Sequence, residues 1–125
     1  MPPSTKKLLI VDDSRVSRMM IRTYVQVRHP DWVLLEAGNG DEALQIAERD
    51  KPDYCTMDIN MPGMPGTDAA EQILAKHTDI RIAVFSADIQ ESQQTRVAEL
   101  GFKFIAKPVT EKSVALALDY LEELA

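Results

Sequence analysis

The sequence lacks most features that mark secreted or membrane-inserted proteins. A single cysteine, Cys55, cannot form an internal disulfide. Because it lies within a predicted strand, we interpret it as a small buried apolar residue rather than a reactive thiol. The opening apolar run, residues 8–11, is far too short for the core of a signal peptide or for a membrane span. We therefore expect a cytoplasmic protein that is not inserted into a membrane.

Positive charge is also scarce. The chain has 14 lysine and arginine residues against 20 aspartate and glutamate residues, which gives a formal net charge of −6. The pair Lys6-Lys7 is too small to form a basic patch, so we expect no direct binding of nucleic acid. His29 and His77 have no partners at the spacing of metal ligands, which argues against a zinc site.

The length and composition predict one globular domain with a substantial core. The 125 residues are 45% apolar and 27% charged. We expect a single domain over residues 1–125, in which residues 1–6 form a short N-terminal tail. After this tail, strand-like and helix-like segments alternate five times. The predicted strands cover residues 7–11, 32–37, 54–57, 81–85 and 104–106.

A helical segment follows each predicted strand. The first helix begins with Asp13 or Ser14 as its cap and ends at residues 29–31. The second covers residues 41–49, and the third opens at Thr67 or Asp68 after the loop 61–66. The fourth covers residues 90–100 and stops at a glycine, and the fifth begins after a cap at Thr110. This alternation predicts an α/β fold, with a parallel sheet, helices on both faces and right-handed crossovers.

Apolar spacing predicts which face of each helix is buried. For the first helix, the predicted core-facing row is Val16, Met19, Met20, Tyr24 and Val27. The fourth helix has few core anchors, Val97 and Leu100, so we expect it to be loosely held. The inner face predicted for the fifth helix is Val114, Ala117, Leu118 and Leu121. A second apolar row on that helix, Leu116 and Tyr120, points to a partner surface.

Charged residues stand directly after three of the predicted strands. Asp12 and Asp13 follow the first strand, Asp58 follows the third, and Lys107 follows the fifth. The carboxyl ends of parallel strands meet at one edge of a sheet, so these side chains should share a pocket. Clustered carboxylates repel one another unless a proton or a cation intervenes. The cation that best suits an all-oxygen site of this kind is Mg²⁺.

The same cluster suits phosphoryl transfer. That reaction needs a positioned nucleophile, positive charge for the phosphoryl oxygens and a metal clamp. A carboxylate can act as the nucleophile and form an acyl phosphate. Asp58 lies at the centre of the predicted cluster and is therefore the candidate nucleophile.

Four short motifs at strand ends resemble the receiver domain of two-component response regulators. They are Val-Asp-Asp-Ser at 11–14, Met-Asp-Ile-Asn-Met-Pro-Gly at 57–63, Phe-Ser-Ala at 85–87 and Lys-Pro at 107–108. The resemblance covers essentially the whole chain. Within the family, the chain is similar to stand-alone chemotaxis-type receivers. It implies a flavodoxin-like doubly wound sheet of five parallel strands in the order 2-1-3-4-5, with five helices.

The resemblance also implies a role for each residue of the cluster. Asp58 would be the phosphoacceptor. The Mg²⁺ ligands would be Asp12, Asp13, Asp58 and the backbone carbonyl of Asn60. Lys107 would pair with a phosphoryl oxygen, and with the carboxylates when no phosphate is bound.

Two further residues resemble the switch residues of the family. Ser86 would donate a hydroxyl hydrogen bond to the phosphoryl group and move toward it. Phe104 would swing into the space released and alter the face formed by the fourth helix, the fifth strand and the fifth helix. Ordinary structural roles remain open for each: a serine at a strand end is often a turn residue, and an aromatic side chain suits an edge strand.

We therefore expect a phosphorylation-activated signalling switch. Its partners would be a histidine kinase or phosphotransfer protein and an unidentified downstream protein target. Its own chemistry would be limited to Mg²⁺-dependent self-phosphorylation and autodephosphorylation, so it would not otherwise be an enzyme. It would be a monomer or a phosphorylation-dependent dimer. The residues 101–104, Gly-Phe-Lys-Phe, lack the acidic side chains typical of the symmetric dimers of winged-helix regulators.

Three other functions fit the residues less well. A phosphatase of the haloacid-dehalogenase type should carry its nucleophile after the first strand in an Asp-x-Asp pattern, whereas this chain has Asp-Asp-Ser at 12–14. A flavin or nucleotide carrier needs an anion cradle at that position, which two carboxylates oppose. A phosphorylation-independent pseudo-receiver would lack a site residue, and none is missing here. Whether the chain acts alone or as the receiver of a longer protein is left open.

Overall fold

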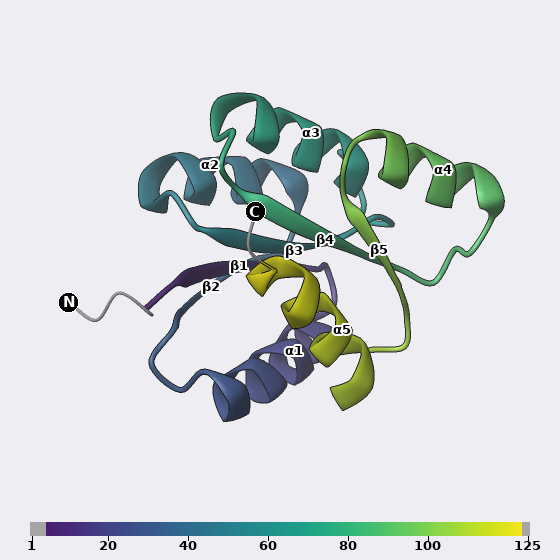
Figure 1. Ribbon diagram of the computed structural model, residues 1–125. Coiled ribbons are helices and arrows are strands. Elements are labelled where there is room, and N and C mark those ends of the chain that lie inside the picture. Colours follow the sequence, from purple (N-terminus) through teal and green to yellow (C-terminus); the bar gives the residue numbers. More distant parts are fainter. Residues whose placement is uncertain (1–4, 124–125) are drawn as a thin grey trace.

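The computed structural model describes residues 5–123, which form a parallel sheet between two layers of helices (Figure 1). The sheet has five strands in the order β2-β1-β3-β4-β5. The strands are β1 (Lys7–Val11), β2 (Val33–Ala37), β3 (Tyr54–Asp58), β4 (Arg81–Ser86) and β5 (Lys103–Ala106). The expected flavodoxin-like fold and its strand order are confirmed. Most of the expected tail, residues 1–4, lies outside the described part.

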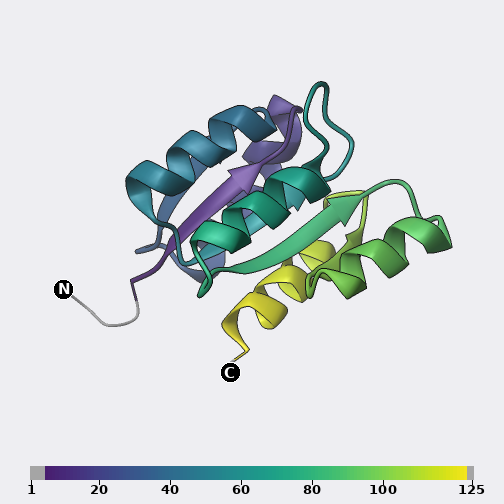
Figure 2. The same cartoon turned by 90° about the horizontal axis from the view of Figure 1, so that it is seen from above.

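The helices divide unequally between the two faces of the sheet. They are α1 (Arg15–Arg28), α2 (Gly40–Asp50), α3 (Gly66–Lys76), α4 (Glu91–Glu99) and α5 (Glu111–Glu122). Helices α1 and α5 cover one face, and α2, α3 and α4 cover the other (Figures 1 and 2). No helix within residues 5–123 is both long enough and apolar enough to cross a membrane.

The inner strand β1 contributes side chains to the cores on both faces of the sheet. Its residues Leu8 to Val11 are all buried, as expected for a strand covered on both faces. Successive side chains of a strand point to opposite faces. Leu9 and Val11 accordingly pack in the core with α2, α3 and α4, whereas Leu8 and Ile10 pack in the core with α1 and α5.

Several predicted helix boundaries are confirmed by their caps. Ser14 caps α1 by accepting a hydrogen bond from the backbone N–H of Ser17. Thr110 caps α5 in a reciprocal capping box with Ser113. Gly101, with φ of +84°, ends the segment of α4 in the left-handed conformation that favours glycine.

Other boundaries differ from the prediction. Helix α3 begins at Gly66 after Pro65, rather than at Thr67 or Asp68, and no side chain caps it. Strand β2 begins at Val33 because the preceding Trp32 instead stacks on the ring of His29, with centroids 3.9 Å apart. The Trp32 contact is local, within the turn that follows α1, where the N–H of Trp32 also donates to the carbonyl of His29 at 3.2 Å.

The predicted inner face of α1 is wrong. Four of the five residues in the predicted row are exposed, with Met19 at 56% and Val27 at 82%. The side chains that α1 buries are Ile21 and Val25. The row that faces the sheet continues toward the N-terminus through Arg18 and Ser14, which are partly buried. The first half of the row that α1 turns toward the sheet is thus polar. A prediction based on the spacing of apolar residues therefore selected the wrong face of the helix.

The predictions for the last two helices are confirmed in part. The four expected inner residues of α5 are buried, and α4 contributes Val97 as its buried residue. Leu116 is exposed, but Tyr120 packs against the core. The Tyr120 hydroxyl donates to the carbonyl of Gly101 at 3.2 Å, and Arg81 lies 4.7 Å above its ring. Tyr120 is therefore engaged within the molecule rather than presented to a partner.

The corrected face of α1 predicts opposite effects for two substitutions on the same helix. Ile21→Ala should lower the free energy of unfolding by about 2–5 kcal/mol, because it leaves a cavity in the core. Met19→Ala should change it by less than about 0.5 kcal/mol, because that side chain is exposed. Urea unfolding followed by circular dichroism measures both. A larger loss of unfolding free energy for Met19→Ala than for Ile21→Ala would contradict the observed face and support the one predicted from periodicity.

Candidate functional site

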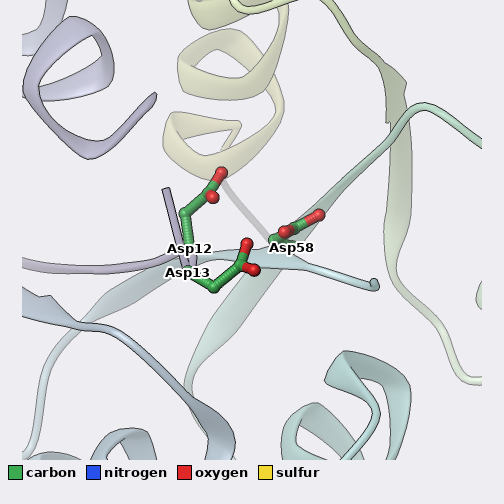
Figure 3. Close-up of side chains that lie close together, drawn as sticks. All are labelled: Asp12, Asp13 and Asp58. Atoms are coloured by element: carbon green, nitrogen blue, oxygen red, sulfur yellow. The ribbon is translucent and has the colours of Figure 1, made fainter. Parts of the chain in front are cut away.

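The three predicted carboxylates meet at the carboxyl edge of the sheet. Asp12 and Asp13 directly follow β1, and Asp58 is the last residue of β3. Each offers one carboxylate oxygen, and these atoms lie within 4.8 Å of one another (Figure 3). Asp12 and Asp58 are buried, whereas Asp13 is exposed. The cluster therefore has a buried floor and one side open to solvent.

Lys107 reaches the cluster from the end of β5. Its Nζ donates to Oδ2 of Asp12 at 3.0 Å and lies 3.5 Å from Oδ1 of Asp58. The backbone N–H of Lys107 donates to the carbonyl of Ser86 at 2.9 Å, which extends the ladder between β4 and β5 by one residue. The ammonium group is thus anchored by the sheet and shared between two carboxylates.

One lysine does not balance three carboxylates. Burial, followed by the charge of Asp12, raises the pKa of Asp58 to about 6; Lys107 opposes this rise, and Asp13 adds to it. For Lys107 itself, burial alone would lower the pKa, but its hydrogen bond to Asp12 and the charge of Asp58 raise it on balance. The site therefore favours a protonated Lys107 and has an excess of negative charge.

This excess fits a hard divalent cation. The donors are carboxylate oxygens, and Mg²⁺ binds through one or two carboxylates together with water or phosphate oxygens. Asn60, whose carbonyl the resemblance adds to the ligands, lies exposed two residues after Asp58. The residues present thus fit a divalent cation that prefers oxygen ligands.

Gly66 allows α3 to approach the backbone of Asp58. A Cβ atom at this position would lie 1.9 Å from the carbonyl oxygen of Asp58, so any other residue would force the two segments apart. The N–H of Gly66 donates to the carbonyl of Ile59 at 2.9 Å, and the N–H of Ile59 donates to Phe85 at 3.1 Å. Sequence reasoning placed Gly66 in a turn and missed this role, for which the Pro-Gly step gives no distinct signal.

Ser86 ends β4 one residue after Phe85, the register partner of Asp58, whereas Phe104 lies further from this edge of the sheet on β5. Ser86 is fully buried, and its Oγ accepts a hydrogen bond from the N–H of Asp88 at 3.0 Å. Phe104 is partly buried and pairs in register with Val84. It packs against the core that also contains Val97 of α4. The two predicted switch residues thus lie on adjacent strands, with the serine near the carboxylates and the aromatic ring near α4.

The chain is similar to known proteins in sequence and in fold. Residues 8–119 match the family model for the response regulator receiver domain. The chemotaxis protein CheY of Listeria monocytogenes is 40% identical over 115 residues, which cover 90% of this chain and 95% of the relative. CheY of Bacillus subtilis is 37% identical over 114 residues, covering 90% and 94%.

Solved structures show the same fold. A CheY-like receiver domain protein from Methanospirillum hungatei has a TM-score of 0.86 at 20% identity and covers 96% of each chain. CheY4 of Vibrio cholerae, crystallised at low pH, has a TM-score of 0.84 at 22% identity and covers 94% of this chain and 99% of its own.

The raised pKa of Asp58 predicts a pH dependence of stability. Its folded-state pKa of about 6 exceeds the reference value of 3.8, so between these values the folded state binds more protons than the unfolded state. Stability should therefore fall as pH rises through this window. Asp58→Asn removes the effect and should stabilise the protein by at most about 3 kcal/mol above pH 7, with no gain below about pH 4.

Urea unfolding across this pH range, with a chelator present, measures the difference between wild type and Asp58→Asn. Asp79→Asn, which removes an exposed acid outside the cluster, is the matched control and should not reproduce the gain. An Asp58→Asn variant that is less stable than wild type at neutral pH would contradict the claim that the negative charge of Asp58 destabilises the folded state.

Proposed function

Because this chain belongs to the receiver domains of response regulators, which take phosphoryl groups from kinases and act on downstream targets, we propose that Asp58 accepts the phosphoryl group. The observation that carries the proposal is the buried Asp58 carboxylate beside Lys107, next to two further carboxylates. Family membership favours this signalling role over the haloacid-dehalogenase and pseudo-receiver alternatives.

The transfer would proceed by attack of the Asp58 carboxylate on phosphorus. A carboxylate oxygen forms the new P–O bond while the P–N bond of a phosphohistidine on the donor protein breaks. The nitrogen keeps the electron pair, and with a proton from water the imidazole leaves neutral. Asp58 must be ionised to attack, and with a pKa of about 6 it is mostly ionised at neutral pH. The Lys107 ammonium would contact a phosphoryl oxygen; the support is its distance of 3.5 Å from Asp58.

We propose Mg²⁺ as the cofactor, with Asp12, Asp13, Asp58 and the carbonyl of Asn60 as its ligands. The support is the group of carboxylate oxygens within 4.8 Å and the shortage of positive charge around them. When bound, the ion supplies positive charge to the phosphoryl oxygens. Asp12 is held in place independently, because it also accepts hydrogen bonds from Lys107 and from the N–H of Ser14.

We further propose that the output is read at the face of α4, β5 and α5. The Ser86 hydroxyl accepts a hydrogen bond from the N–H of Asp88. Rotation of this hydroxyl toward a phosphoryl group on Asp58 would break that bond and free the segment that leads into α4. Helix α4 is anchored through Val97, and Phe104 packs in the same core. Movement of the Phe104 ring would therefore change the packing of α4.

Other expectations stay predictions. The proposed partners are a histidine kinase or phosphotransfer protein and an unidentified downstream protein. We predict a single receiver domain over residues 1–125 that is a monomer or a phosphorylation-dependent dimer. We also predict a location in the cytoplasm and no direct binding of nucleic acid. The proposed chemistry is limited to self-phosphorylation and autodephosphorylation.

The phosphoacceptor is tested by chemical phosphorylation. With acetyl phosphate and Mg²⁺, wild type should gain one phosphoryl group, and borohydride trapping with peptide mass spectrometry should place it on Asp58. Asp58→Asn should not be labelled to a comparable extent, and a chelator should suppress labelling of wild type. A modified Asp12 or Asp13, or full labelling of Asp58→Asn, would disprove the assignment.

The output route is tested by nuclear magnetic resonance. Beryllofluoride, a phosphoryl mimic that binds the active state better, should shift amide signals from Asp58 through Ser86 to Phe104 and α4. Ser86→Ala should at least halve the shifts in α4 and leave Mg²⁺ binding intact. Phe104→Ala should keep phosphorylation but uncouple α4. Shifts confined to the carboxylate pocket in wild type would contradict the route without affecting phosphoacceptance.

A further inference from the structure

The buried row of α1 contains an arginine that reaches the acidic site. The side chain of Arg18 is 18% exposed, and its Nη1 donates to the backbone carbonyl of Asp12 at 2.6 Å. Its Nε donates to Oε1 of Glu36 on β2 at 3.0 Å. The guanidinium therefore bridges the backbone carbonyl of Asp12, at the end of β1, and the carboxylate of Glu36 on β2.

This contact fixes a peptide group rather than a side chain. The carbonyl of Asp12 belongs to the planar unit that links Asp12 to Asp13, so an interaction that orients the carbonyl also orients the bond to the Asp13 Cα. The N–H of Asp12 is separately bound to the carbonyl of Ala37 at 3.1 Å. A short, charge-assisted hydrogen bond at the next peptide adds a second restraint where β1 ends.

Asp13 depends on this restraint more than the other acids do. Asp12 and Asp58 are buried and are both near Lys107. Asp13 is exposed, and its carboxylate meets the cluster because the backbone turns it toward Asp58 (Figure 3). A change in the orientation of the Asp12–Asp13 peptide would therefore displace one of the three oxygens and leave the other two in place.

The structure supplies a matched comparison in Arg22. Arg22 lies one turn further along α1, and its Nη1 donates to the other oxygen of Glu36 at 3.1 Å. Its side chain is 39% exposed, compared with 18% for Arg18. The two arginines thus share the Glu36 ion pair, but it is Arg18 that binds the Asp12 carbonyl. Each arginine carries one positive charge beside the single carboxylate of Glu36, so replacing either one removes the same charge from this pair. What distinguishes Arg18 is its contact with the Asp12 carbonyl.

We propose that Arg18 is a positioning residue for the acidic site: it holds the Asp12–Asp13 peptide in the orientation that presents the Asp13 carboxylate to Mg²⁺. This inference rests on the metal-binding role proposed above. Partners that orient metal ligands commonly affect metal affinity by about tenfold or more. Arg18 binds the backbone carbonyl of Asp12 and the carboxylate of Glu36, so its proposed role is to position a ligand and not to act as one.

The test compares Arg18→Met with Arg22→Met. Both remove an ion pair with Glu36 and keep a long apolar stem on α1. Arg18→Met should weaken Mg²⁺ binding about tenfold, as measured by calorimetry or by amide shifts, whereas Arg22→Met should change it less than about twofold. Without Mg²⁺, the amide signal of Asp13 should move in Arg18→Met and stay in place in Arg22→Met. Arg18→Lys can reach the carbonyl without the two-pronged contact and should give an intermediate affinity.

The outcomes separate this inference from the proposed function. Urea unfolding confirms that each variant is folded before its Mg²⁺ affinity is compared. Equal Mg²⁺ affinities in wild type and Arg18→Met, or equal losses in both arginine variants, would overturn the positioning role alone. Mg²⁺ binding by wild type without phosphorylation of Asp58 would overturn the phosphoacceptor and leave the role of Arg18 supported. A wild type that binds no Mg²⁺ would overturn both.

Discussion

Three carboxylates and one lysine meet at the carboxyl edge of the sheet, and the rest of the site depends on this excess of negative charge. Asp12 and Asp58 are buried, where an uncompensated charge is unfavourable. Lys107 contacts both, but its single charge leaves the pKa of Asp58 raised. In the proposed function, a cation supplies the missing positive charge and so allows an anionic phosphoryl group to bind beside it. The repulsion among the carboxylates is then the source of the proposed cation affinity.

The fold maintains this arrangement through backbone contacts on several sides. Gly66 lets α3 press against the carbonyl of Asp58, and Arg18 holds the carbonyl of Asp12 from α1. Lys107 is tied to β4 through the carbonyl of Ser86. Each contact acts on the main chain at or just after the end of a strand. The charged groups are thus placed by the surrounding elements as well as by their own attraction.

The sequence predicted the strands and the acidic cluster well because both depend on local patterns. A short apolar run followed by Asp12 or Asp58 specifies a buried strand and a polar end, and the parallel topology brings these ends together. The face of α1 could not be read in this way, because Arg18 occupies the buried row and serves the site instead of the core. Likewise, the start of α3 depends on the close approach of Gly66 to the backbone at the end of β3. Sequence periodicity fails where a position makes a polar or backbone contact with another element.

The two sides of the cluster differ in how firmly they are held. On the side of β1, Arg18 and Glu36 connect the backbone of Asp12 to α1 and β2 by hydrogen bonds. On the side of β4, the Ser86 hydroxyl holds one N–H of the segment before α4, and that helix contributes Val97 to the core. If Asp58 is phosphorylated as proposed, the β1 side is the more firmly held of the two and the β4 side is the less firmly held. A structural response should therefore travel toward β5 and α4, while the carboxylates keep the geometry that the reaction needs.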